Sequence, residues 1–274
     1  LPLAPQTDAI FRSVKDNFIS PLIAAFKIEA INQDSTALVI KVNDIYDGTE
    51  TSINNVFTNI NLGTSAIKNL SRILSIKSFP NNVVATSELT TKVTEGTTSV
   101  YVTVEVSSSI LLLPEKPMTG RFDNQKVGYF TNPLLSFSDA QQGTDKKQYI
   151  TRWRMEPKPE DREAYLKGQT VEPIKPIVFY IDNSTPYQWR SYIKKGIEDW
   201  QTAFEKAGFK NAIIAKEITD SMHVDMDDVN YSVLTYAASE KKNAMGPSLL
   251  DPRSGEILEA DIMWWHNVLS MVRE

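Results

Sequence analysis

The chain has 274 residues, 41% of them hydrophobic and 23% charged, with a formal net charge of −5 at pH 7. This composition is typical of a globular protein with one large domain or two ordinary ones, and its weak negative charge argues against nucleic-acid binding. The absence of cysteine excludes disulfides, thiol nucleophiles and thiolate metal sites, and no run approaches the ~20 apolar residues of a membrane span.

The start of the chain does not look like a natural N-terminus. Leu1 is not an initiator residue, and the residues after it lack the charged and apolar regions of a signal peptide. We therefore expect that an upstream segment has been removed, a signal peptide being one candidate.

Up to about residue 155 the sequence predicts β structure. Two runs, Leu22–Ile31 and Ala37–Tyr46, flank the turn-forming residues Asn32–Ser35 and predict a hairpin. A short helix is expected over Thr64–Leu70, and further strands over Ser71–Phe79, Val83–Val93 and Ser99–Ser107. In the last of these runs valine occupies every second position, which is the period of a strand.

The middle of the chain is less regular. Pro114–Asp145 is rich in proline, glycine and polar residues and is interpreted as a connecting region that packs on the sheet. Lys146–Met155 predicts another strand. Glu156–Pro176 combines four prolines with many charges and predicts a linker or surface excursion.

The pattern changes after Pro176. Ile177–Ile181 is a continuous apolar run, typical of a strand buried on both faces. Thr185 is the expected N-cap of a long helix with Pro186 at its first position, and Gly208 is the expected C-terminal cap. Apolar residues recur at helical spacing on one face of this helix: Ile193, Ile197, Trp200, Ala203, Phe204 and Ala207.

Four more strands are expected after the helix. They cover Ala212–Ile218, Tyr231–Ala238, Pro247–Leu250 and Ile257–Trp264. The last two flank the turn signal Asp251–Gly255 and predict a second hairpin, and a further helix is expected to begin near His266. This order predicts a mixed sheet backed by one helix.

The predicted fold class is therefore α+β. We divide the chain into a β-rich accessory domain over residues 1–155, a linker over residues 156–175 and a second domain over residues 176–274.

The two histidines do not supply a metal site by themselves. An HExxH zinc helix needs imidazoles at positions i and i+4, whereas His223 and His266 lie 43 residues apart. His223 lies in an acidic loop, Ser221–Asn230, whose aspartates are able to bind a hard cation, but a solvated loop is the favoured interpretation. His266 is interpreted as a helix-start residue near the core.

Other catalytic patterns are missing or too weak to use. The sequence has no G-x-S-x-G motif of a serine hydrolase and no glycine-rich phosphate loop. Among its 34 acidic residues, no pattern singles out a pair of glycosidase carboxylates. The five tryptophans suggest a sugar-binding platform, but buried packing is favoured for them: Trp153, Trp189, Trp200, Trp264 and Trp265.

A series of strings carries a family resemblance between Lys175 and Val272. They read KPIVFYIDNSTP, WRSYIKKGIEDWQTAFEKAGFKNAI, VNYSVLTY and NAMGPSLLDPRSGEILEADIMWWHNVL. This region resembles the first half of a metzincin-like zinc metallopeptidase domain, in a family of large bacterial secreted or cell-envelope proteases. The preceding VGYF, KKQYITRWRMEP and VEP look like the end of the β-rich domain of unknown function that precedes this protease domain.

The resemblance implies a specific order of elements. Such half-domains run strand, helix, strand, strand, edge strand and strand, and then the helix that carries HExxHxxGxxH. That motif would lie after Glu274, so we expect this chain to hold no catalytic residue and no metal ligand. The intact protein is expected to use zinc to polarise the scissile carbonyl and a glutamate to activate water, on peptide or protein substrates in a secreted, cell-envelope or periplasmic setting.

The resemblance also implies a substrate-pairing edge strand. In such sheets an extended peptide pairs with the edge by main-chain hydrogen bonds. Here the candidate residues are Asn243, Ala244, Met245, Gly246 and Ser248. Gly246 would allow close backbone approach, and the alternative is an ordinary hairpin strand with a turn at Gly246-Pro247.

Two alternatives to an enzyme remain open from the sequence. One is a non-catalytic binding or structural module that reuses the half-fold, and the other is a glycan-binding protein that uses the tryptophans. A sheet without its following helix would also leave an apolar surface, to be covered by dimerisation or by the first domain folding back.

Overall fold

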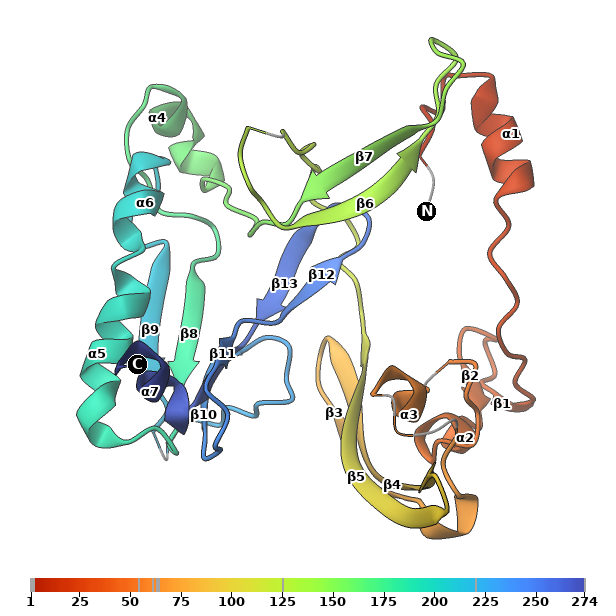
Figure 1. Cartoon of the computed structure of the whole chain (residues 1–274). Coiled ribbons are helices and arrows are strands. Elements are labelled where there is room, and N and C mark those ends of the chain that lie inside the picture. The colour runs from red at the N-terminus through yellow and green to blue at the C-terminus, as the bar shows by residue number, and fades with distance from the viewer. Residues whose placement is uncertain are drawn as a thin grey trace. The chain divides into compact units, whose positions relative to one another are not determined.

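The computed structural model describes residues 3–53, 55–60, 62, 65–124, 126–219 and 221–273. The chain forms two compact units (Figure 1). Unit 2 comprises Ile19–Leu112, and unit 1 combines Leu1–Phe18 with Leu113–Glu274. The strand-rich mixture of sheets with few helices confirms the predicted α+β class. The predicted domain division at residues 155 and 176 stays a prediction.

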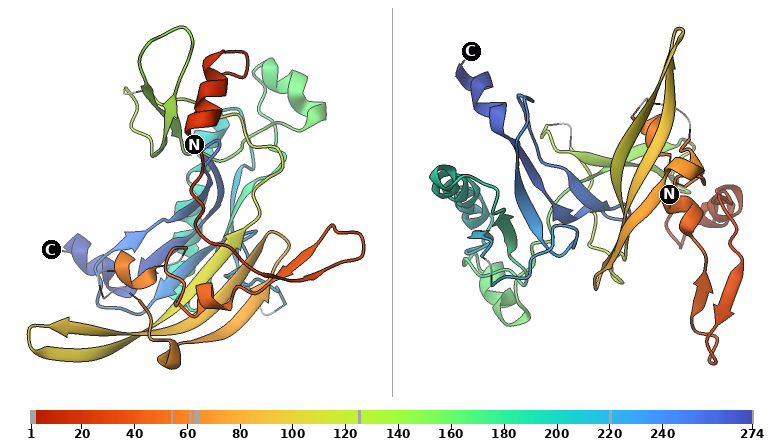
Figure 2. Two further views of the ribbon diagram at one scale, coloured as in Figure 1. Left: turned by 90° about the vertical axis from the view of Figure 1, so that its right-hand side faces the viewer. Right: turned by 90° about the horizontal axis from the view of Figure 1, so that it is seen from below.

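Unit 2 is built on a three-stranded antiparallel sheet in the order β3-β4-β5. Its strands are β3 (Arg72–Ser78), β4 (Asn82–Glu95) and β5 (Thr98–Leu111). The β4–β5 ladder is unbroken from Asn82 opposite Leu111 to Glu95 opposite Thr98. Figure 2 shows this pair as a long twisted ribbon, as the right-handed twist of strands requires. All three predicted strands are confirmed, and β4 and β5 extend beyond the predicted ranges 83–93 and 99–107.

The first predicted hairpin is confirmed in a shorter form. β1 (Ile28–Ile31) pairs antiparallel with β2 (Leu38–Ile40). The extension of the second strand to Tyr46 is wrong, because residues 43–46 form the helical turn α2 (Asn43–Tyr46). That turn places both Ile45 and Tyr46 against Ala85 of β4. In a strand, these two successive side chains would point to opposite faces of the sheet.

Two short helical turns complete unit 2. α3 (Val56–Asn59) is capped by the Asn55 side chain, which accepts a hydrogen bond from the Thr58 amide. Of the helix predicted over residues 64–70, the structure contains the 3₁₀ turn η1 (Lys68–Leu70), while Thr64 lies outside the described residues.

Unit 1 contains a two-stranded sheet that the sequence predicted only in part. β6 (Thr131–Ser136) pairs antiparallel with β7 (Asp145–Ile150), and α1 (Ile10–Asn17) lies in the same unit. The interpretation of residues 114–145 as a connecting region is wrong for residues 131–136, which form β6. The sequence gives no strand signal there, because β6 contains Pro133 and lacks alternation, and it is the pairing with β7 that makes it a strand.

The predicted strand over residues 146–155 ends early, at Ile150. Beyond it the backbone is irregular, and Trp153 and Met155 pack on the core of the second sheet. The predicted linker is also partly structured, with η2 (Pro159–Asp161) and α4 (Arg162–Leu166) inside it. Tyr165 stacks on Phe209 with ring centroids 5.0 Å apart, so this segment is folded onto the unit.

The main sheet of unit 1 is mixed, as predicted. Its order is β11-β14-β10-β8-β9. The strands are β8 (Ile177–Ile181), β9 (Ile213–Glu217), β10 (Ser232–Ala237), β11 (Ala244–Met245) and β14 (Ile262–Trp265). Neighbouring strands are parallel except β11, which runs antiparallel to β14.

The helix that backs the sheet is divided in two. α5 (Tyr187–Glu198) and α6 (Gln201–Lys206) meet at a tight turn, where the Trp200 amide donates to the Ile197 carbonyl at i−3. Such a turn shifts the angular position of the residues after it. Trp200 is 65% exposed, so its predicted burial is wrong, whereas Ile193, Ile197 and Phe204 do pack on the sheet.

The two predicted helix caps have different outcomes. Gly208 adopts a φ of +91°, the left-handed conformation expected of a C-terminal glycine. The prediction that Thr185 caps the helix is wrong, because α5 begins at Tyr187 and the residue at its N-cap position is Pro186. Within the described part of the chain, its buried hydroxyl has no hydrogen-bond partner.

The second predicted hairpin is confirmed, but the strand after its turn is divided. β12 (Ser248–Asp251) pairs with β13 (Glu256–Ala260), and the chain bends at Asp261 before entering β14 of the main sheet. The helix expected near His266 is present as η3 (His266–Leu269) followed by α7 (Ser270–Arg273).

Ile181 lies at the centre of the main core and is 1% exposed. Ile181→Ala is expected to lower the unfolding free energy of unit 1 by roughly 2–5 kcal/mol, because it removes buried methyl groups and leaves a cavity. Urea denaturation followed by tryptophan fluorescence measures this. Ile174→Ala, at an exposed position of the same unit, is the control, and an equal loss in both variants would contradict the assignment of the core.

Candidate functional site at the free edge of the sheet

Strand β11 forms one edge of the main sheet. Ala244 lies opposite Trp264 and Met245 opposite Met263. Among the residues that the structure describes, no further strand pairs with the other side of β11. Both of its residues are exposed. The edge can therefore accept an added strand through main-chain hydrogen bonds.

The backbone of this edge has a local hydrogen-bond partner. The Ala244 amide donates to the Asn243 Oδ1 atom at 2.8 Å, so a side chain covers one donor of the edge. A Cβ atom added at Gly246 would meet only the Asp261 carbonyl oxygen, at 3.8 Å. Gly246 therefore has open space beside it, which suits the close approach of another backbone.

The five predicted edge residues do not all lie in one strand. Asn243, Ala244, Met245 and Gly246 follow one another along the edge, whereas Ser248 belongs to β12 and pairs with Ala260 of β13. The step Gly246-Pro247 connects the two strands, as the turn interpretation requires. The edge and the turn are thus both present in the structure.

Two polar side chains near this edge were not singled out together from the sequence. Tyr236 lies near the carboxyl end of β10, and His266 comes directly after the parallel strand β14. The Tyr236 hydroxyl lies 2.8 Å from His266 Nδ1. The carboxyl ends of parallel strands are the usual place for ligand-binding groups. Thirty positions separate these residues, so only the strand pairing brings them together.

His223 and the acidic loop do not join them. His223 is exposed, and the aspartates close local turns, with the Asp227 amide donating to Asp225 Oδ1 and the Asn230 amide to Asp228 Oδ1. In the described ranges, no group of three or more His, Asp or Glu side chains is placed to hold a metal ion. The described side chains of this chain therefore do not provide the ligands of a zinc site.

A pair of acidic side chains, buried Glu259 and half-buried Asp261, lies beside the edge. Asp261 accepts a hydrogen bond from the Val233 amide at 2.8 Å, and its own amide donates to the Pro247 carbonyl. Glu259 is 8% exposed, and its Oε1 atom has no hydrogen-bond partner in the described structure. Burial, with a hydrogen bond to Asp261 and the charge of that carboxylate, raises the pKa of Glu259 to about 8. The buried position of Glu259 therefore favours its protonated form.

Four of the five tryptophans line one apolar cavity of about 790 Å³. It is bounded by the main sheet and by α5 and α6, and its tryptophans are Trp153, Trp189, Trp200 and Trp264. The other lining residues are aliphatic or aromatic apart from Gly196, with few polar groups. A sugar platform needs hydrogen-bonding groups beside its rings, so this lining does not favour the glycan-binding interpretation.

No helix among the described residues has the length and apolar character needed to cross a membrane.

Comparison with known proteins names one family. No curated protein and no solved structure matches the chain. Residues 2–158 match the family described as Domain of unknown function (DUF5117), and this finding does not name a metallopeptidase. Because the match spans more than half of the 274 residues, the chain belongs to the DUF5117 family.

Proposed function

We propose that this chain is part of a zinc-dependent endopeptidase, a bacterial protein that is secreted or held in the cell envelope. Within it, β11 is the strand with which an extended peptide substrate pairs. The observation that carries the proposal is the position of β11, which is the antiparallel edge of an otherwise parallel sheet. Peptides commonly bind by adding a strand to such an edge.

The order of elements supports the same proposal. The resemblance leads us to expect strand, helix, strand, strand, edge strand and strand, followed by a helix. The chain runs β8, α5–α6, β9, β10, β11 and β14, followed by η3 and α7, with the β12–β13 hairpin inserted before β14. Zinc, where bound in the intact protein, supplies a Lewis acid for the scissile carbonyl. The present chain contributes the substrate-pairing edge.

The experiment is peptide hydrolysis by the intact protein with Met245→Pro in β11. Proline removes an amide donor and crowds the edge, so kcat/KM for an unfolded protein substrate should fall at least tenfold, mainly through KM. Met245→Leu keeps the amide and serves as the matched control. A chelator should abolish hydrolysis, and added zinc should restore it.

A non-catalytic peptide-binding module that uses the same edge strand is the alternative, and the exposed position of β11 supports it equally. It predicts that the intact protein binds peptides at β11, with the same sensitivity to Met245→Pro, but does not hydrolyse them. Hydrolysis that persists in a chelator would contradict the zinc-dependent proposal.

A further inference from the structure

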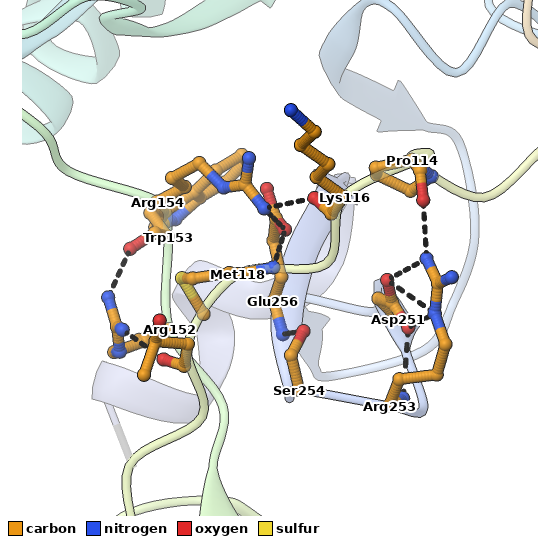
Figure 3. A network of polar contacts seen from close by, with 11 residues as sticks. Pro114, Lys116, Met118, Arg152, Trp153, Arg154, Asp251, Arg253, Ser254 and Glu256 are labelled. Atoms are coloured by element: carbon orange, nitrogen blue, oxygen red, sulfur yellow. Dashed lines mark hydrogen bonds and ion pairs between the residues drawn. The ribbon is translucent and has the colours of Figure 1, made fainter.

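The β12–β13 hairpin lies against segments that belong to the DUF5117 match. Its turn, Asp251–Gly255, and the start of β13 contact residues 114–118 and residues 150–154 (Figure 3). All of these residues belong to unit 1. The hairpin therefore joins the family domain to the edge of the main sheet.

The first element of this contact is an ion pair. Arg154 Nη2 donates to Glu256 Oε2 at 2.8 Å and to the Lys116 carbonyl at 2.9 Å. The Met118 amide donates to the same Glu256 oxygen at 3.3 Å. Glu256 is buried, so one carboxylate of β13 ties together two segments of the family domain.

The second element is Arg253 in the turn. Its Nε and Nη2 atoms donate to the two carboxylate oxygens of Asp251 at 2.9 and 2.7 Å, and Nη2 also donates to the Pro114 carbonyl at 2.6 Å. Asp251 is 0% exposed, and its hydrogen bond from Arg253 is the main reason that its pKa lies below the usual range. Arg253 thus shapes the turn and fastens it to Pro114.

Backbone pairing adds a third element. The Arg152 amide donates to the Gly255 carbonyl at 3.0 Å, and the Ile257 amide donates to the Arg152 carbonyl at 2.9 Å. A short strand-like pairing therefore runs between the family domain and β13, parallel in direction.

Both ends of the hairpin lead to the substrate-pairing edge. Gly246-Pro247 joins β11 to β12, and Asp261 joins β13 to β14, with the Asp261 amide donating to the Pro247 carbonyl at 3.0 Å. β11 pairs over only two residues, which is too short a strand to hold its register without support from neighbouring structure.

We propose that the DUF5117 part of the chain positions the edge strand β11 through this hairpin, with Arg154 and Glu256 as the positioning pair. Buried ion pairs seldom stabilise a fold more than apolar residues of the same volume, and their best-attested role is to specify one arrangement. The use of β11 by a peptide rests on the proposed function, whereas the mechanical link between the two parts does not.

The test is amide hydrogen exchange in the full 274-residue chain with Arg154→Met, Glu256→Met and the double variant. Each single variant leaves one charge without its partner, and the double variant removes both charges. We expect exchange of the β11 and β14 amides to accelerate at least tenfold in all three variants, while the β8 and β9 amides of the double variant keep the wild-type rate.

The double variant separates positioning from stability. If it restores slow exchange in β11, or if β8 and β9 accelerate in it as much as β11, the pair has a merely structural role and the proposal is overturned. Glu172→Gln is the matched control, because it weakens the more exposed Lys158–Glu172 ion pair of the same unit and should leave β11 unchanged. Exchange does not require peptide hydrolysis, so failure of the proposed function would leave this result intact.

Discussion

Replacing Glu259 with glutamine is expected to weaken the decrease in unfolding free energy that we expect for the wild-type chain between pH 5 and pH 8. The pKa of Glu259 is raised to about 8 in the folded chain, chiefly by burial and then by Asp261. In the unfolded chain the group ionises near its ordinary value of 4.5. Its contribution is therefore fully present below about pH 4.5 and is lost as the pH rises through 8.

The expected loss is on the order of 3 kcal/mol in unfolding free energy between pH 5 and pH 8. Glutamine has the shape of the protonated carboxyl but cannot ionise, so the variant should be more stable than wild type at pH 8. Urea denaturation over this pH range measures both effects. The control is Glu163→Gln, at a side chain that is largely exposed in the same unit. An unchanged pH dependence in Glu259→Gln would show that another group is responsible.

Gly255→Ala is expected to have the second large effect, because it disturbs both the turn and its contact with the family domain. Gly255 has a φ of +74°, and a Cβ atom there would lie 2.6 Å from the Ile150 carbonyl oxygen. The left-handed backbone costs an alanine roughly 1–2 kcal/mol, and the close contact adds roughly 1–3 kcal/mol. Thermal or urea denaturation of unit 1 should show a loss of unfolding free energy equal to the sum of these two costs.

Gly168→Ala separates these two costs. Gly168 has a similar φ of +81°, but a Cβ atom added there would meet no described atom within 4 Å. The unfolding free energy of this variant should therefore fall only by the cost of placing an alanine in the left-handed backbone conformation. Equal losses in the two variants would mean that the backbone of β7 does not restrict the turn at Gly255.

The hairpin also bears on how the chain is divided into folding parts. The family match ends at residue 158, yet the Arg152 backbone and the Arg154 side chain contact residues 255–257. The region around residues 150–154 therefore has partners beyond the family match as well as within it. These contacts connect residues of the family match directly to the hairpin that leads to the sheet edge.

The sequence by itself determined the elements whose signals are local. The valine alternation of Ser99–Ser107 predicts β5, the apolar run Ile177–Ile181 predicts β8, and Asp251–Gly255 predicts the hairpin turn, all of which are present. These signals work because strand period and turn conformation depend on neighbouring residues. The α+β class and the mixed sheet follow from their order.

Only the tertiary structure decided which distant residues meet. Residues 43–46 form a helical turn because Ile45 and Tyr46 both pack on Ala85, and β6 exists because β7 pairs with it. β11 is a strand of two residues, defined by its partner β14 and by no pattern of its own.

The candidate site divides in the same way. Asn243 to Gly246 were named from a sequence resemblance, and the structure places Ala244 and Met245 at the edge of the sheet. The pairing of Arg154 with Glu256, 102 positions apart, and of Tyr236 with His266 had no local signal. Such contacts depend on how strands and hairpins close over long stretches of chain, and the free energy of that closure is not encoded in neighbouring residues alone.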